Sequence, residues 1–171
     1  MVIKQIFNNN VVLAKNSSKD ELVAMGCGIA FKKKVGDKIN ENSIEKTFIL
    51  KQKDASEKFK LLLEDIPAEH VSICYDIIEY AKNMLDIELN DYIYVTLTDH
   101  ISYALKLNKD GIKRSNVLMW EIKKFYPKEF TLGEYALAYI EEQKGIRLWP
   151  QEAANIALHF VNAQNNAGSM Q

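Results

Sequence analysis

The sequence predicts α and β structure in separate domains: a small antiparallel β-sheet or half-barrel in residues 1–55, a linker helix over residues 56–66, and an all-α bundle of about five helices in residues 67–171. Short β-branched runs separated by turn residues fill the first part, whereas apolar residues recur every three or four positions from Ser56 onward. The charge divides at the same place: the first 55 residues have a balance of +4 and the remainder a balance of −5. We therefore expect only the first part to meet a polyanion.

The β part is predicted from short runs and the turns between them. Asparagine tolerates left-handed backbone angles, so the tract at residues 8–10 predicts a turn between two strands. The expected strands cover residues 2–7, 11–13, 21–25, 29–33 and 44–50. A unit of this size buries little area by itself, and a symmetric dimer is its expected partner.

The helical part is predicted from period and from start and stop residues. Thr131 and Glu134 have the spacing of a capping box, Gly145 is a typical helix end, and Pro150 is a typical helix start. After the linker helix, the expected helices cover residues 71–85, 90–105, 116–126, 131–145 and 150–160.

Composition limits the class of protein. No apolar run is long enough to span a bilayer, and the N-terminus lacks the apolar stretch of a signal peptide, so we expect a cytoplasmic protein without membrane insertion. Cys27 and Cys74 are far apart in sequence, which indicates neither a disulfide framework nor a cysteine-based zinc site. No cofactor is expected.

One stretch of the β part, residues 25–34, combines three features of a nucleic-acid surface. Gly26 and Gly28 expose bare backbone, Phe31 offers a ring for base stacking, and three lysines follow it. The alternative is a glycine bulge, a core phenylalanine and a solvated run of lysines.

Two histidines of the helical part are candidates for chemistry. His100 lies on an apolar helix face next to Asp99, and His159 shares a face with Glu152 and Asn155. Either histidine could be an ordinary core residue. Alternatively, a metal or hydrolytic site could be built from His100, His159, Asp99 and Glu152. In a third interpretation, the two histidines accept phosphoryl groups through a neutral ring nitrogen.

Motifs in both parts resemble a known family. In the β part they are Asn8-Asn9-Asn10-Val11 and Met25-Gly26-x-Gly28-Ile29-x-Phe31. In the helical part they are Leu97-Thr98-Asp99-His100-Ile101 and Glu152-Ala153-Ala154-x-Ile156-Ala157-Leu158-His159-Phe160-Val161-Asn162-Ala163. The first pair resembles the RNA-binding co-antiterminator domain of BglG/SacY/LicT-type transcriptional antiterminators, and the second pair resembles their first phosphotransferase-system (PTS) regulation domain.

The resemblance implies a homodimeric, non-enzymatic regulator that binds a hairpin in a leader mRNA of a sugar-utilisation operon. Holding this hairpin prevents an overlapping terminator stem from forming. DNA is not an expected partner, because the acidic balance of residues 56–171 disfavours helices that face a phosphate backbone. The implied RNA-binding residues are Lys4, Gln5, Asn8, Asn10, Gly26, Cys27, Gly28, Phe31, Lys32 and Lys33.

For the helical part, the resemblance implies that His100 and His159 receive phosphoryl groups from PTS donors, namely the sugar permease and HPr. Asp99 and Glu152 would support them, and phosphorylation in the absence of the sugar would switch the protein off. Family members usually carry a second regulation domain after the first. The resemblance therefore implies that this chain is a truncated piece whose activity is either unregulated or altered.

The chain departs from the family pattern at two positions. Cys27 stands where the family commonly has arginine, and Gln5 stands where it often has lysine, with Lys4 expected on the opposite face of the strand. The loss of a guanidinium removes a bidentate donor and a stacking plane. The backbone of Gly26 and Cys27 and the amide of Asn10, as donor and acceptor, are expected to remain available. A metal-dependent enzyme built on the two histidines is the alternative function.

Overall fold

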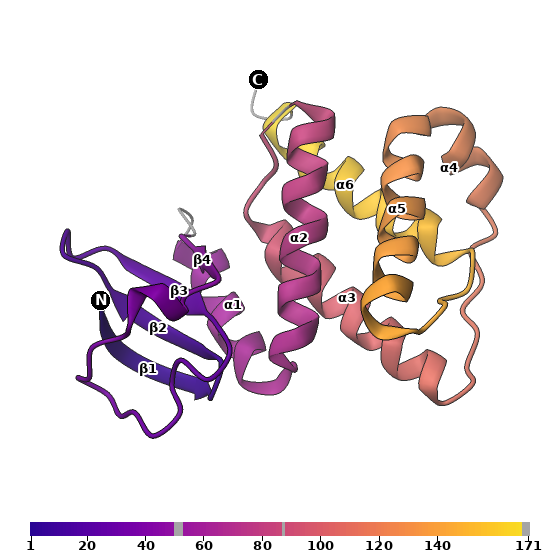
Figure 1. Cartoon of the computed structure of the whole chain (residues 1–171). Coiled ribbons are helices and arrows are strands. Elements are labelled where there is room, and N and C mark those ends of the chain that lie inside the picture. The colour runs from indigo at the N-terminus through magenta and orange to yellow at the C-terminus, as the bar shows by residue number, and fades with distance from the viewer. Residues whose placement is uncertain (50–52, 87, 169–171) are drawn as a thin grey trace. The chain divides into compact units, whose positions relative to one another are not determined.

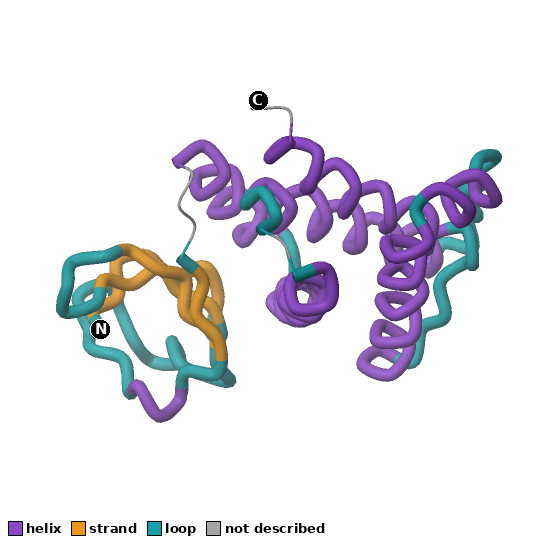
Figure 2. Tube along the Cα trace, turned by 90° about the horizontal axis from the view of Figure 1, so that it is seen from above, coloured by secondary structure: helices purple, strands orange, loops and turns teal. Residues whose placement is uncertain are grey.

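The computed structural model describes residues 1–49, 53–86 and 88–168. By its internal contacts the chain divides into two compact units, Met1–Ser72 and Ile73–Gln171. Strands are confined to the first unit, and the second is helical (Figures 1 and 2). Each unit is described by itself below.

The first unit contains a four-stranded sheet in which each strand pairs antiparallel with the next along the chain (Figure 1). The strands are β1 (Val2–Asn8), β2 (Val11–Lys15), β3 (Glu21–Met25) and β4 (Lys46–Phe48). Four of the five expected strands are therefore found. Leu50, at the end of the last expected strand, lies outside the described residues.

The prediction of a strand over residues 29–33 is wrong, because this stretch forms turns. Gly28 and Lys32 both have left-handed backbone angles, with φ of 69° and 58°, and the chain cannot continue in the extended conformation through them. The Phe31 N–H instead donates to the Gly28 carbonyl at 3.0 Å. The apolar residues Ile29 and Ala30, which suggested a strand, are buried in the core of the unit.

The core of the first unit lies between one face of the sheet and the segment that follows β3. Figure 2 shows this segment curving round to close the space beside the strands. The core residues are Ile3, Val12, Ala14, Leu22, Ala24, Ile29, Ala30 and Ile39. Val11, Leu13 and Val23 alternate with them along the strands and are buried as well.

Among the described residues, the α-helices are the expected linker helix and five more (Figure 1). They are α1 (Lys53–Asp65), α2 (Ala68–Leu85), α3 (Tyr92–Lys109), α4 (Met119–Phe125), α5 (Pro127–Lys144) and α6 (Glu152–Gly168). In the first unit, the ring of Phe59 on α1 packs against that of Phe48 on β4, with 5.4 Å between centroids. The predicted fold class is confirmed. No described helix is long and apolar enough to cross a membrane.

The expected start of α5 is wrong, whereas its expected end is confirmed. The helix begins at Pro127, whose fixed φ suits a first helical position, and Thr131 lies inside it. The Thr131 hydroxyl donates back to the Pro127 carbonyl at 2.9 Å and does not cap the helix. Gly145 ends the helix with a φ of 68°, and its N–H donates to the Glu141 carbonyl at 2.8 Å.

Helices α5 and α6 approach each other closely at Gly133. A Cβ atom at this position would lie 2.1 Å from the Ala153 carbonyl oxygen, which is too close for any side chain. Phe130 and Ile122 pack against Ala153, Ala154 and Ala157 in the same region. This packing sets the position of the first turn of α6, where Glu152 lies.

Candidate functional site

Two turns of the first unit are joined by hydrogen bonds, and they carry most of the candidate RNA-binding residues. The Gly26 N–H donates to the Asn10 carbonyl at 3.0 Å, and the Gly28 N–H donates to the Asn10 side-chain oxygen at 2.7 Å. The Ala30 N–H donates to the Asn9 carbonyl at 2.9 Å. The asparagine turn after β1 and the glycine turn after β3 therefore form one surface.

Several polar groups of this surface already take part in internal hydrogen bonds. The Asn10 amide oxygen accepts the Gly28 N–H with one of its two lone pairs, so the amide keeps acceptor capacity as well as its Nδ2 donors. The Cys27 N–H donates to Glu45 Oε2 at 3.2 Å, and the Gly26 N–H is also occupied. Asn8 serves the turn itself, since its Oδ1 accepts from the Asn10 N–H at 2.8 Å.

The two glycines are required for different reasons. A Cβ at Gly26 would lie 2.0 Å from the Ser43 carbonyl oxygen, so the close approach that demands glycine is to the chain's own backbone. A Cβ at Gly28 would meet nothing within 4 Å, but its φ of 69° favours glycine. Gly26 therefore supports the fold of the turn, and Gly28 sets its direction.

Phe31 is not a core residue, because 59% of its surface is exposed. The ammonium of Lys32 lies 5.4 Å from the centre of its ring. Lys33 donates from Nζ to the Lys38 carbonyl at 3.2 Å, and Cys27 is exposed. An exposed ring beside ammonium groups is an arrangement that can stack on a base and attract phosphate.

Lys4 and Gln5 lie at an irregularity in β1. The pairing register shifts between Ile3 and Gln5, which interrupts the strict alternation that predicted opposite faces for Lys4 and Gln5. Gln5 Nε2 donates to Glu64 Oε1 on α1 at 3.3 Å, while Lys4 is exposed.

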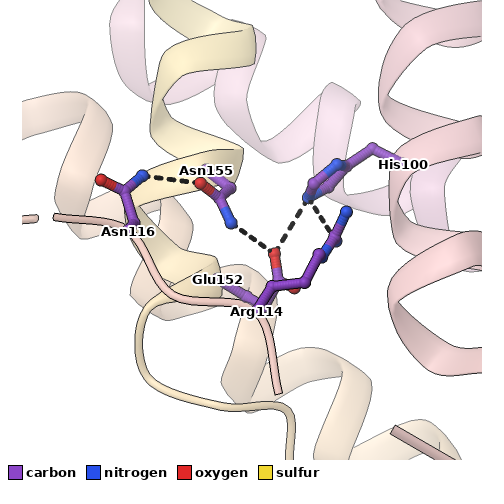
Figure 3. Close-up of polar contacts among 5 residues, drawn as sticks. All are labelled: His100, Arg114, Asn116, Glu152 and Asn155. Carbon is purple, nitrogen blue, oxygen red and sulfur yellow. Dashed lines mark hydrogen bonds and ion pairs between the residues drawn. The ribbon is translucent and has the colours of Figure 1, made fainter. Parts of the chain in front are cut away.

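In the second unit, α3 and α6 bring His100 and His159 together, with ring centroids 4.9 Å apart. His100 Nε2 lies 3.0 Å from Glu152 Oε1, and the Glu152 side chain is almost fully buried (Figure 3). Arg114, from the connection between α3 and α4, donates to Glu152 Oε2 from Nε at 3.0 Å and from Nη2 at 2.8 Å. Two distant motifs thus meet at one carboxylate.

Two asparagines extend this cluster (Figure 3). Asn155 Nδ2 donates to Glu152 Oε1 at 2.9 Å, and Asn116 Nδ2 donates to Asn155 Oδ1 at 2.6 Å. The buried carboxylate of Glu152 is therefore satisfied by His100, Arg114 and Asn155, as a buried charge requires.

The pKa shifts follow from these contacts. Burial alone would raise the pKa of Glu152, but hydrogen bonds from His100, Asn155 and Arg114 lower it to about 2. An ionised Glu152 can only accept hydrogen bonds, so His100 donates to it from a protonated Nε2. Burial and the interactions with His100 and Arg114 lower the pKa of His159 to about 4. His159 is therefore a neutral imidazole at neutral pH, the form that can act as a nucleophile.

The two histidines line an open cavity of about 350 Å³ together with Arg114, Ser115, Asn155, Leu158 and Asn162. Its lining includes the guanidinium of Arg114, a cationic hydrogen-bond donor that suits an anion such as a phosphoryl group. Within the described ranges, no group of three histidine, cysteine or acidic side chains could hold a metal ion.

The sequence indicated four residues of this cluster of six and gave no signal for two. His100, His159, Glu152 and Asn155 are indicated by helical spacing, and the structure brings them together. Arg114 and Asn116 lie outside any regular period, so spacing gave no signal for them. Asp99 is exposed on α3, and the hydrogen bonds of the cluster do not involve it.

Comparison with known proteins assigns a family to both regions. Residues 1–57 match the CAT RNA binding domain, and residues 75–163 match the PRD domain. The chain belongs to the LicT/BglG-type antiterminator family. Below, the CAT region means residues 1–57 and the PRD means residues 75–163.

Individual relatives agree with this assignment. The chain is 49% identical to the transcription antiterminator LicT of Bacillus subtilis over 166 residues, which are 97% of this chain and 60% of LicT. It is 42% identical to the beta-glucoside operon antiterminator of Dickeya chrysanthemi over 164 residues, 96% of this chain and 58% of that protein. The crystal structure of GlcT CAT-PRDI superposes with a TM-score of 0.80 at 34% identity, and the match covers 95% of this chain and 96% of that one.

The chain spans about three fifths of the length of these curated relatives. These relatives are named as antiterminators. The individual RNA-binding and phosphorylation residues stay predictions.

Proposed function

We propose that this chain is an antiterminator that works as a homodimer in the cytoplasm, with the CAT region bound to a hairpin in a leader mRNA. Holding the hairpin would keep an overlapping terminator stem from forming. The observation that carries the proposal is the exposed Phe31 with Lys32 beside it, next to the Asn10 turn, in a region that matches the CAT RNA binding domain.

Each group of this surface has a chemical task in the proposal. Phe31 stacks on an unpaired base, and the Asn10 amide donates to a base edge. Lys4, Lys32 and Lys33 attract phosphates, and this attraction weakens as salt rises. Gly26, Gly28 and Asn8 hold the two turns in place. Gln5 and Cys27 contribute no positive charge.

The PRD is the regulatory part of the proposal. His100 and His159 would accept phosphoryl groups from PTS proteins, the sugar permease and HPr, with Glu152 supporting His100. The charge that arrives would change how the two chains are arranged, and α1 would carry this change to the CAT region. The cavity beside the histidines, with the Arg114 guanidinium in its lining, supports this role.

We also propose functional boundaries at residues 1–55 for the RNA-binding domain, 56–66 for the linker helix and 67–171 for the regulation domain. The matches to the CAT RNA binding domain and to the PRD domain, over residues 1–57 and 75–163, support this division. The helix break between Asp65 and Ala68 supports it as well.

RNA binding is tested by a gel shift of the full chain against the leader hairpin of a β-glucoside operon and a scrambled RNA of equal length, at about 50 and about 200 mM salt. We expect a shift for the hairpin that weakens at the higher salt, and a much weaker one for the scrambled RNA. Sedimentation of the mixture should show two chains on one hairpin. Equal binding to both RNAs would contradict the proposal.

Regulation is tested with His100→Asp and His159→Asp, which place a negative charge at each histidine. Gln143→Asp is the control, because it adds a negative charge at an exposed position of α5, away from the cavity. We expect the first two variants to change dimer affinity by sedimentation and RNA affinity by gel shift, while the control leaves both unchanged. If all three behave like the unsubstituted chain, the histidines do not regulate RNA binding.

A further inference from the structure

Arg114 links a segment outside the histidine motifs to the centre of the cavity. It lies in residues 110–118, the connection between α3 and α4, which we call the 110–118 connector. Among the contacts of the described residues, two side-chain contacts tie this connector to α6: the ion pair of Arg114 with Glu152 and the hydrogen bond of Asn116 to Asn155. Figure 3 shows the Asn116–Asn155 hydrogen bond and the Arg114 side chain beside Glu152.

The guanidinium of Arg114 also faces the histidine pair. Its Nη2 lies 3.3 Å from His100 Nε2, and Arg114 lines the same cavity as His159. A guanidinium has five N–H donors in a planar fork, and its contacts with Glu152 come from two of its three nitrogens. Arg114 is thus placed to meet an anion that arrives on the neighbouring ring.

We propose that Arg114 binds the phosphoryl group accepted by His159, and that it leaves Glu152 to do so, which releases the 110–118 connector from α6. This inference rests on the proposed function, since it takes His159 as a phosphoryl acceptor. Arg114 is a phosphoryl-binding and positioning residue in this scheme, and Glu152 is its partner in the unphosphorylated state.

The transfer itself is a substitution at phosphorus. The lone pair on a ring nitrogen of His159 forms the new N–P bond while the bond from phosphorus to the donor's leaving group breaks. One proton passes from the imidazole, through solvent, to the departing group. His159 suits the attacking role because it is neutral, whereas His100 already donates its Nε2 proton to Glu152.

The exchange of partners follows from charge. A phosphoryl group carries nearly two negative charges and three acceptor oxygens, whereas the carboxylate of Glu152 carries one charge. A guanidinium matches phosphate geometry with paired hydrogen bonds. Glu152 keeps its hydrogen bonds from His100 and Asn155 after Arg114 has left, so its carboxylate stays partnered.

The experiment uses the full chain with phosphoramidate as a small phosphoryl donor, in which ammonia is the leaving group. Phosphohistidine formation is followed by phosphorus NMR, its position is assigned by peptide mass spectrometry, and hydrogen exchange is measured in the 110–118 connector. Arg147→Gln is the matched control, because Arg147 forms a comparable pair with Glu141 outside the cavity.

For the unsubstituted chain and Arg147→Gln, we expect modification at His159 and faster exchange in the connector after phosphorylation. Arg114→Gln should be phosphorylated about 10- to 100-fold more slowly, because a hydrogen bond to a charged group is lost. Phosphorylation of this variant should not raise hydrogen exchange in the connector any further. The phosphorylation rate of Arg114→Lys should fall between those of Arg114→Gln and the unsubstituted chain. Glu152→Gln should be phosphorylated at least as fast as the unsubstituted chain, with a connector that exchanges quickly beforehand. A purely structural role for Arg114 would not produce this opposite effect.

Three outcomes would overturn the inference. If Arg114→Gln matches the unsubstituted chain in rate and in exchange, Arg114 does not bind the phosphoryl group, although the proposed function survives. Modification confined to His100 has the same consequence. If the unsubstituted chain accepts no phosphoryl group from either phosphoramidate or phosphorylated HPr, the regulatory half of the proposed function fails together with the inference. Thermal unfolding of each variant verifies that it is folded.

Discussion

The rings of His100 and His159 lie 4.9 Å apart, centroid to centroid, although they come from different helices of the PRD. Glu152 holds His100 through its Nε2, and Arg114 pairs with the same carboxylate. His159 is left as a neutral ring beside them, with a lowered pKa. The pair thus combines one ring held by a carboxylate with a second ring suited to nucleophilic attack.

The lowered pKa of His159 predicts a pH dependence of stability. The charged and titratable groups that face it are His100 on α3, Glu152 on α6 and Arg114 in the connector. Its pKa is about 4 in the folded chain against an ordinary 6.5, so the unfolded chain binds the extra proton between these values. The free energy of unfolding should therefore fall as pH drops from 6.5 to 4, with no further loss from this residue below 4.

Denaturant unfolding at a series of pH values measures this dependence. His159→Gln cannot titrate, so its free energy of unfolding should depend less on pH between 6.5 and 4 than that of the unsubstituted chain. Glu152, whose pKa is about 2, should lower the free energy of unfolding further below pH 4.5. NMR titration of the His159 ring should give a midpoint near 4. A midpoint at the ordinary value, or an unchanged slope in His159→Gln, would contradict the prediction.

Gly133→Ala should destabilise the PRD by about 1–3 kcal/mol, because the added Cβ would meet the Ala153 carbonyl of α6 at 2.1 Å. Alanine is intrinsically better than glycine in a helix, so the loss must come from the contact between the helices. Glu142→Ala, at an exposed position of α5, is the control and should stay within about 0.5 kcal/mol. Equal stability of the two variants by urea unfolding would exclude close packing at Gly133.

Gly26→Ala should cost the CAT region more stability than Gly28→Ala. At Gly26 the new Cβ would lie 2.0 Å from a backbone oxygen of Ser43, so the backbone must shift, which should lower the free energy of unfolding by about 3 kcal/mol. At Gly28 there is open space, and the cost is the left-handed conformation of a residue with a Cβ, about 1–2 kcal/mol. Thermal unfolding of both variants checks the order, and the reverse order would show that the turn is built differently.

Phe31→Ala should weaken hairpin binding by about 1–3 kcal/mol through the loss of a stacked ring. Stability should change by less than about 0.5 kcal/mol, because the ring is largely exposed. Val35→Ala, at an apolar residue of the same segment that is 61% exposed, is the matched control and should bind RNA normally. Equal RNA affinity of the two variants by gel shift would rule out stacking by Phe31.

Cys27→Arg should tighten hairpin binding and steepen its salt dependence by about one phosphate contact. Cys27 is exposed on the surface of the two turns, so an arginine there can reach the RNA without repacking the core. Cys27→Ser adds no charge and should leave both the affinity and the salt slope unchanged. A salt slope in Cys27→Arg equal to that of Cys27→Ser would show that position 27 does not face the RNA backbone.

Local sequence determined the elements of this protein. The alternation of β1 to β3 and the helical period after residue 56 depend on which neighbours along the chain share a face, and this is set by backbone geometry alone. The same spacing placed Glu152, Asn155 and His159 on one face of α6. Start signals were less reliable: Thr131 and Glu134 have the spacing of a capping box, yet Pro127 begins the helix.

Contacts between distant segments were decided only by the tertiary structure. The left-handed angles at Gly28 and Lys32 end the extended conformation, so Ile29 and Ala30 turn into the core while Phe31 stays exposed. The Asn10 side-chain oxygen accepts a hydrogen bond from the Gly28 N–H of the neighbouring turn. Arg114 pairs with Glu152 from a connector without helical periodicity, so residue spacing could not predict this contact. The physical reason is that a buried carboxylate takes its partners from whichever segments the packed helices bring near, and sequence distance does not encode that proximity.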